Sequence, residues 1–281
     1  MRVRVPASSA NLGPGFDTLA LALALHVEVS VSPADSLTIV ATGEGADLPT
    51  GPDHLAAQVV RAVAGHDRFA IEVHSSIPVG RGLGSSAALA VAAAAAVGAD
   101  DVLAVAAAVD GHPENAAASM MGGLVTATTV EGAPVSNRLA LDPELAFVVL
   151  VPDRLLPTKE ARAALPTSIP HGDAGFNLGR TGLLLAGLAD HRLLVAEATE
   201  DRLHQPYRTP LFPESVALLA GLRAAGALAV CWSGAGPSLL AICTADSADG
   251  VQRAGERLLA DAGVAGRSLR LAPDLHGLVV E

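Results

Sequence analysis

Aromatic residues, lysine and cysteine are scarce in this chain of 281 residues. Phe, Trp and Tyr together make up 2% of the sequence, so any hydrophobic core must consist mainly of Ala, Val and Leu. Lys159 is the single lysine beside many arginines. The two cysteines, Cys231 and Cys243, are too few for a disulfide framework and sit in apolar runs. This pattern favours reduced thiols and a cytoplasmic location.

The chain also lacks a positive net charge and a long apolar run. Its net charge of −11 argues against nucleic acid or an anionic membrane as the main partner. The longest apolar stretch, residues 87–99, is shorter than the ~20 residues that span a bilayer. Met1 to Pro6 leads directly into a polar turn, so no signal peptide is expected. With 51% hydrophobic residues, the chain is expected to fold as one large or two modest domains.

Glycine is concentrated in the central stretch Pro78-Val79-Gly80-Arg81-Gly82-Leu83-Gly84-Ser85-Ser86. The preceding residues 70–75 alternate apolar and polar as in a half-buried strand, and residues 87–99 favour a helix. We expect Ser85 or Ser86 to cap that helix. A glycine loop entering a helix N-terminus offers free N–H groups and partial positive charge, which suits phosphate. A turn without a ligand stays open as the alternative, because the spacing matches neither G-x-x-x-x-G-K-[ST] nor G-x-G-x-x-G.

The rest of the chain alternates expected strands and helices without an internal repeat. Residues 152–157 have the composition of a linker, which predicts domains at 1–151 and 152–281. Apolar periodicity predicts strands near residues 2–5, 19–32, 37–41, 124–129, 146–151, 227–232, 238–243 and 268–271, and helices near 53–64, 101–109, 116–121, 159–165, 177–188, 193–198 and 214–225.

Two further loops are rich in turn residues. Residues 8–17 read Ser-Ser-Ala-Asn-Leu-Gly-Pro-Gly-Phe-Asp, and residues 233–238 read Ser-Gly-Ala-Gly-Pro-Ser between two apolar strands. The later turn is either a simple strand connection or a close approach to the phosphates of a nucleotide.

The order of these three loops resembles the GHMP small-molecule kinases. Three runs narrow the resemblance to the homoserine kinases: Gly-His-Pro-Glu-Asn at 111–115, Pro-Thr-Lys-Glu-Ala-Arg-Ala-Ala-Leu-Pro at 157–166, and Asp-Arg-Leu-His-Gln-Pro-Tyr-Arg at 201–208. The resemblance implies an α+β fold of two domains, one like ribosomal protein S5 domain 2 and one ferredoxin-like. It also implies ATP and Mg²⁺ as cofactors, a homodimer, and phosphorylation of the L-homoserine hydroxyl to O-phospho-L-homoserine in threonine biosynthesis.

The resemblance also assigns roles to individual residues. The substrate is a zwitterion, so Asp17, with Asn11 beside it, is expected to bind its ammonium, and Arg162 and Arg208 to clamp its carboxylate. Turn formation alone also favours Asn and Asp at the first two positions. The family match gives four expected catalytic residues, namely His112, Asn115, Thr158 and Arg162. Of these, His112 and Asn115 match residues near the reacting hydroxyl, and Thr158 matches a substrate-pocket position that could orient it. ATP is expected on the glycine loop, at Pro78, Gly80, Arg81, Gly82, Leu83, Gly84, Ser85 and Ser86.

Two departures from the family pattern concern carboxylates. Glu114 stands where the family usually has Asp, and residues 102–109 lack the acids that precede this motif in relatives. Asp110, with Ser85, is therefore the expected metal ligand. Two other functions stay open: another GHMP kinase, of the mevalonate or diphosphocytidyl-methylerythritol type, or a non-catalytic metabolite sensor of the same fold.

Overall fold

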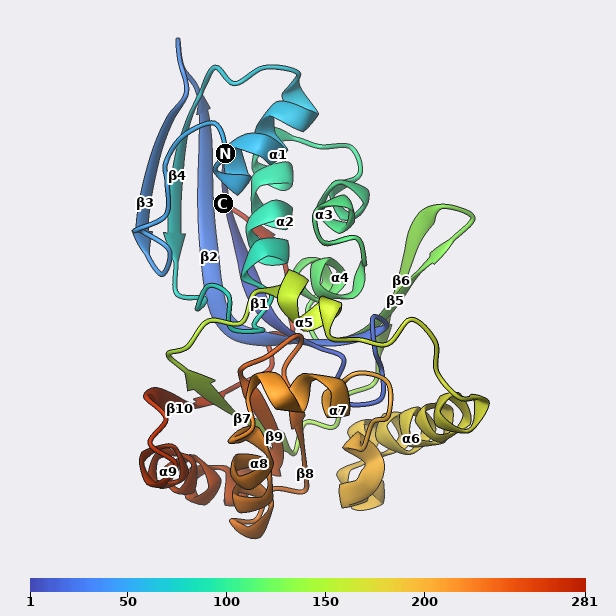
Figure 1. The fold of residues 1–281 in the computed structure, drawn as a ribbon. Helices are drawn as coiled ribbons and strands as arrows, with labels where there is room; N and C mark the ends of the chain where they lie inside the picture. The colour runs from blue at the N-terminus through green and yellow to red at the C-terminus, as the bar shows by residue number, and fades with distance from the viewer.

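A computed structural model describes residues 1–281, which fold around two sheets (Figure 1). The first sheet has the order β11-β1-β2-β4-β3, and the β5–β6 hairpin extends it from β2. All its pairings are antiparallel except that of β3 with β4. Its strands are β1 (Arg2–Ala10), β2 (Leu19–Pro33), β3 (Thr38–Gly43), β4 (Phe69–Ser75), β5 (Leu124–Val130), β6 (Ala133–Leu139) and β11 (Val279–Val280).

Four helices cover one face of this sheet (Figure 1). They are α1 (Leu55–Ala64), α2 (Ser85–Val97), α3 (Val102–Asp110) and α4 (Glu114–Met121). Helix α2 is alanine-rich, buried around most of its circumference, and contacts α1, α3, α4, β1 and β2. Small side chains allow these neighbours to approach α2 closely. The core is therefore dense with almost no aromatic residues.

The second sheet is antiparallel, with the order β10-β7-β9-β8. Its strands are β7 (Leu145–Pro152), β8 (Ala229–Trp232), β9 (Leu239–Thr244) and β10 (Gly266–Leu271). Every residue of β7 is buried. Phe147 and Val149 belong to the large core shared with the first sheet, whereas Val148 and Leu150 belong to the core under α8 and α9. A strand covered on both faces carries an unbroken apolar run.

The remaining helices surround the second sheet and the junction between the two halves. In Figure 1, α5 and α7 lie between the upper and lower halves. These helices are α5 (Thr158–Ala163), α6 (His171–Ala189), α7 (Gln205–Arg208), α8 (Ser215–Ala224) and α9 (Ala245–Asp261), with short 3-10 turns at His191–Leu193, Ala196–Thr199 and Thr209–Leu211. None of the helices is long and apolar enough to cross a bilayer.

The predicted α+β class is confirmed, while the domain boundary at 151/152 stays a prediction. Strand pairing argues for a different division, because all but the last residue of β7 lie before that boundary, and β7 pairs only with strands of the second sheet. The chain then returns, and β11 pairs with β1 in the first sheet. The two chain ends consequently lie near each other in Figure 1.

Candidate active site

A polar cavity lies where the two halves meet. It is lined by the glycine loop, the β1–β2 loop, the junction of α3 and α4, helices α5 and α7, and the turn between β8 and β9. Its lining includes most of the predicted site: Asn11, Asp17, Gly80, Gly82, Leu83, Gly84, Ser85, Ser86, Asp110, His112, Asn115, Thr158, Arg162 and Arg208. It also includes residues that were not predicted, namely Ala10, Glu114, Gly234 and Ala235.

The glycine loop presents an open helix end to this cavity. Gly80, Gly82 and Gly84 all have positive φ. Helix α2 begins at Ser85, and its N-cap is Gly84, which has no side-chain cap. The prediction that Ser85 or Ser86 caps the helix was wrong, because both serines lie inside the first turn. The first backbone N–H groups of α2 are therefore free for an anion.

The turn at residues 233–238, called the late turn below, holds the glycine loop in place. Ser233 Oγ donates to the carbonyl of Gly82 at 2.6 Å, and the carbonyl of Leu83 accepts from the backbone N–H of Ser8 at 3.1 Å. A Cβ at Gly82 would overlap the carbonyl of Ser233. The turn at 233–238 therefore closes over the loop rather than serving only as a strand connection.

Two predicted loop residues lie outside the cavity lining. Pro78 precedes the loop, and the guanidinium of Arg81 donates to the carbonyls of Val79, Pro152 and Asp153 at 2.9–3.1 Å. Arg81 thus ties the loop to the end of β7. Its donors are directed at backbone carbonyls and not into the cavity.

Asn11 organises the loop at residues 8–17, called the early loop below. Its Oδ1 accepts the backbone N–H of Asp17 at 3.0 Å, and its Nδ2 donates to the carbonyl of Gly234 at 2.9 Å. Asn11 and Asp17 both have positive φ, a conformation that Asn and Asp adopt more readily than most residues. Asn11 therefore positions Asp17 and links the early loop to the late turn.

Asp17 and Arg162 bind each other. Both terminal nitrogens of Arg162 donate to the two carboxylate oxygens of Asp17 at 2.9 Å. The hydrogen bond to Asp17 raises the pKa of Arg162, and the side chains are 29% and 42% exposed respectively. The two residues predicted to receive opposite ends of a zwitterion thus bind each other.

Arg208 is a buried cation without a carboxylate partner. Its residue surface is 2% exposed, and it makes no ion pair. Its Nη1 donates to His204 Nδ1 and to the carbonyl of Gly234, both at 3.0 Å. Burial lowers the pKa of Arg208 to about 10, so the group is still charged at neutral pH. An anion in the cavity would compensate this charge.

His204 supports Arg208 and was not predicted as a site residue. Burial lowers the pKa of His204 to about 4, so the ring is neutral at pH 7. Its Nε2 donates to the carbonyl of Gly13 at 2.7 Å, and Nδ1 is then free to accept from Arg208. His204 lies four residues before Arg208 in the 201–208 run. This spacing could have identified it as a neighbour of Arg208.

His112, Glu114 and Asn115 form one hydrogen-bonded group at the junction of α3 and α4. His112 Nδ1 lies 2.7 Å from Glu114 Oε1, which also accepts from Asn115 Nδ2 at 3.2 Å. Burial alone would lower the pKa of His112, but the carboxylate of Glu114 raises it overall, with Asp17 and Asp110 adding to the effect. Glu114 is 1% exposed.

The cavity also contains oxygen ligands suited to a divalent cation. Burial raises the pKa of Asp110, and its carboxylate accepts no hydrogen bond within the protein. Ser85 lines the same cavity. Asp17, His112 and Glu114 also bring ligand atoms within 4.8 Å of one another, but Arg162 and His112 already engage the two carboxylates. A hydroxyl and a carboxylate without a donor fit the oxygen preference of Mg²⁺.

A second cavity of about 270 Å³ also contacts Ser85 and Ser86. Its lining is mainly apolar and includes Val79 of the glycine loop, together with Leu48, Leu55 and Leu89, which the sequence did not mark as functional. An apolar cavity beside a loop with free backbone N–H groups is suited to a flat ring system.

The chain matches two family models, GHMP kinases N terminal domain over residues 54–123 and GHMP kinases C terminal over residues 184–261. The homoserine kinase of Moorella thermoacetica is 41% identical, with 99% of each chain covered, and that of Streptomyces avermitilis is 45% identical over 91% of this chain and 90% of its own. The crystal structure of homoserine kinase from Cytophaga hutchinsonii superimposes with a TM-score of 0.87, at 26% identity, over 100% of this chain and 97% of that one. These matches confirm the two-domain GHMP kinase fold, and the chain belongs to the homoserine kinase family.

Proposed function

We propose that this chain transfers the γ-phosphoryl group of ATP to the side-chain hydroxyl of L-homoserine, giving O-phospho-L-homoserine and ADP. GHMP kinases use ATP, and the free N–H groups at the start of α2 suit its phosphates. The apolar cavity beside Ser85 and Ser86 is suited to the base. Phosphoryl transfer depends on positioning and charge neutralisation, which this arrangement of backbone dipoles and side chains supplies.

The observation that carries the choice of substrate is the buried charge of Arg208. Arg208 has no anionic partner, and it lies in the same cavity as Asp17 and Arg162. An α-amino acid supplies a carboxylate for the guanidinium groups and an ammonium for Asp17. Mevalonate has no ammonium group, so it would leave Asp17 unused. The cavity therefore favours a zwitterionic substrate over that of a mevalonate-type kinase.

The remaining polar residues fit the reacting end of the substrate. Asn115, His112 and Thr158 line the cavity between the glycine loop and α5, where a hydroxyl group would meet the γ-phosphate. We place Mg²⁺ on Asp110 and Ser85, two oxygen ligands of the cavity that no protein donor occupies. When bound, the metal supplies positive charge that neutralises the phosphate oxygens.

Two further expectations remain proposals. The family resemblance suggests a homodimer, which light scattering of the intact chain tests. Cys231 and Cys243 are free, and burial raises the pKa of each thiol to about 12. Two unreactive free thiols fit a reducing compartment such as the cytoplasm.

A coupled assay of ADP release tests the function and the role of Arg208. The intact chain is expected to turn over L-homoserine but not mevalonate, and a chelator of Mg²⁺ is expected to stop turnover. Arg208→Lys keeps a charge but loses the planar fork, so it should raise the homoserine KM at least about tenfold and leave the ATP KM nearly unchanged. Turnover of mevalonate alone would contradict the function.

Arg192→Lys is the matched control, because Arg192 is exposed and lies outside the cavity. It should change neither KM. Arg208→Ala tests the charge itself, with the melting temperature recorded to separate a folding defect from a binding defect. An equal rise of both KM values in a folded Arg208→Lys variant would mean that Arg208 does not bind the substrate carboxylate. Strong stabilisation by ATP and homoserine without ADP release would favour a sensor.

A further inference from the structure

Glu114 is a buried carboxylate to which the proposed reaction gives no task. It is the first residue of α4 and is 1% exposed. One oxygen, Oε1, accepts from both His112 Nδ1 and Asn115 Nδ2, whereas Oε2 is buried without a partner. Burying a carboxylate is costly, so a residue of this kind is retained where its two hydrogen bonds matter.

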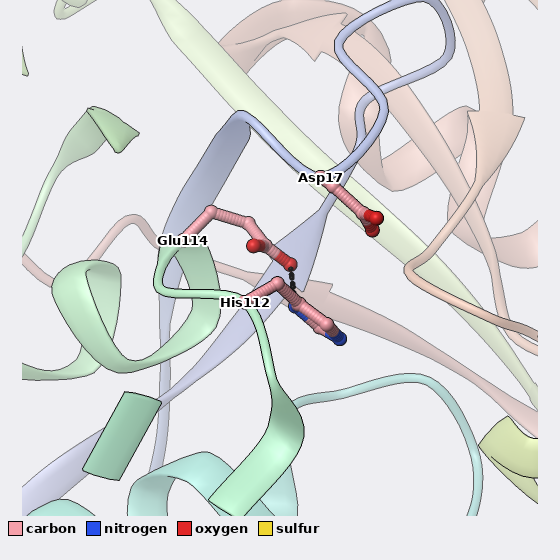
Figure 2. A group of neighbouring side chains, drawn as sticks. All are labelled: Asp17, His112 and Glu114. Atoms are coloured by element: carbon pink, nitrogen blue, oxygen red, sulfur yellow. Dashed lines mark hydrogen bonds and ion pairs between the residues drawn. The ribbon is translucent and has the colours of Figure 1, made fainter. Parts of the chain in front are cut away.

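The first of these hydrogen bonds fixes the histidine ring. An ionised carboxylate only accepts, so His112 Nδ1 carries a hydrogen. In the neutral ring Nε2 is then an acceptor, and in the protonated ring it is a second donor. This nitrogen is buried and has no partner in the protein, and Figure 2 shows it pointing away from Glu114. His112 lines the cavity. A hydroxyl group of a ligand, which can both donate and accept, would supply the missing partner.

The second hydrogen bond fixes the amide of Asn115. Ser8 Oγ donates to Asn115 Oδ1 at 2.8 Å, so the amide is held at both ends and cannot rotate freely. A Cβ built on Gly84 would lie 3.1 Å from Asn115 Oδ1, which places this amide against the start of α2. Asn115 therefore stands between the expected phosphate site and Glu114, with one N–H still available.

We propose that Glu114 is a positioning residue for phosphoryl transfer, which fixes the tautomer of His112 and the orientation of the Asn115 amide. In this arrangement His112 Nε2 forms a hydrogen bond with the substrate hydroxyl. The hydroxyl oxygen bonds to the γ-phosphorus as the bond from phosphorus to the β,γ-bridging oxygen breaks. The hydroxyl proton is released to water, and ADP leaves. This inference rests on the proposed homoserine kinase activity.

The kinetic test compares Glu114→Gln, Glu114→Ala and Glu114→Asp. Loss of an orienting partner of this kind costs about 10- to 100-fold in activity. We expect Glu114→Gln and Glu114→Ala to lower kcat by this factor and to change the KM for ATP and homoserine less than about threefold. Glu114→Asp keeps the carboxylate and should recover part of kcat. Glu256→Gln, an exposed carboxylate on α9, is the control and should change nothing.

The structural test follows the ¹⁵N resonances of the histidine rings, with His112 assigned from a His112→Gln variant. At a pH at which the rings are neutral, the intact chain should show His112 with its hydrogen on Nδ1, and Glu114→Ala should give a mixture of tautomers. A folded Glu114→Ala variant with unchanged kcat, or one with an unchanged tautomer, would overturn the inference. If the intact chain does not phosphorylate homoserine at all, the proposed function fails instead.

Discussion

At the scale of single residues, we propose that the pair of Asp17 and Arg162 determines which ligands the cavity accepts. Each group satisfies the hydrogen bonding of the other. In this proposal a zwitterion replaces both halves of the pair, with its ammonium on Asp17 and its carboxylate on Arg162. A ligand with one charge separates the pair and leaves one member without a partner. The pair is partly exposed, so its own strength is about 0–1 kcal/mol, and the uncompensated group adds to the cost.

This exchange predicts a specific pattern with substrate analogues. 4-Hydroxybutyrate lacks the ammonium group, and its kcat/KM should fall at least about tenfold below that of homoserine, or ~1.4 kcal/mol. In Asp17→Asn the ion pair no longer has to be separated, so the ratio of kcat/KM for homoserine to kcat/KM for 4-hydroxybutyrate should fall. Steady-state kinetics of the intact chain and of Asp17→Asn with both substrates give the four values of a double-mutant type of cycle. A ratio that is the same in both proteins would contradict the exchange.

The identity of these residues could be predicted from the sequence, but their pairing could not. Asp17 and Arg162 are 145 residues apart, and their contact depends on how α5 folds back over the β1–β2 loop. Arg81 illustrates the opposite case. A cation inside a glycine loop suggests a phosphate ligand, yet its guanidinium donates to the carbonyl of Val79 and to two carbonyls at the end of β7. Local sequence does not reveal which acceptors the fold brings within reach.

At the scale of elements, we propose that ATP binding depends on the open N-terminal end of α2. Gly84 has φ +66° at this end, and a Cβ there would overlap Ser8 Oγ and crowd Asn115. Gly84→Ala should therefore raise the ATP KM at least about tenfold, because the first turn must shift to avoid Ser8. The left-handed conformation itself costs a non-glycine residue about 1–2 kcal/mol. Measurements of ATP affinity and melting temperature separate these two effects.

Gly98 is a matched control on the same helix. It has φ +83° at the C-terminal end of α2, with open space around its Cβ position. Gly98→Ala should lower stability by a similar 1–2 kcal/mol and leave ATP binding unchanged. If both variants lose affinity equally, the loss reflects general destabilisation of α2 and not the geometry of its N-terminal end.

The predicted elements agree with the structure where apolar periodicity is strong. The expected strand at 70–75 and helix at 87–99 correspond to β4 and α2. No pattern marks β6, because it is largely exposed and pairs only with β5. The amphipathic α9 was also missed, since its sequence is largely polar and contains two glycines. The expected helix at 193–198 is instead two short 3-10 turns.

At the scale of the whole molecule, the C-terminal segment fastens the chain back onto the first sheet. Asp274 is central to this closure. Its carboxylate accepts from His26 on β2 and from the backbone N–H groups of His276 and Gly277 at 2.8–2.9 Å. Its backbone N–H donates to Ala22 at 3.1 Å. Burial alone would raise the pKa of Asp274, but these hydrogen bonds lower it to about 2.

This low pKa predicts how the closure responds to acid. The pKa of Asp274 is lower in the folded state than the ordinary 3.8, so the unfolded chain binds the proton more readily. The stabilisation is complete well above pH 3.8 and is lost as the pH falls through about 2. From the size of the shift it amounts to roughly 2 kcal/mol at neutral pH. Asp274→Asn should therefore lower the free energy of unfolding by roughly this amount at pH 7.

The pH dependence separates the charge of Asp274 from its shape. In urea titrations, the difference between the intact chain and Asp274→Asn should shrink to roughly half at pH 3, because protonation removes the same charge from the native carboxylate. Asp261→Asn, at an exposed site on α9, should show no difference at either pH. A gap that stays constant between pH 7 and pH 3 would mean that Asp274 acts through packing alone. The C-terminal segment would then be held by backbone pairing and not by its carboxylate.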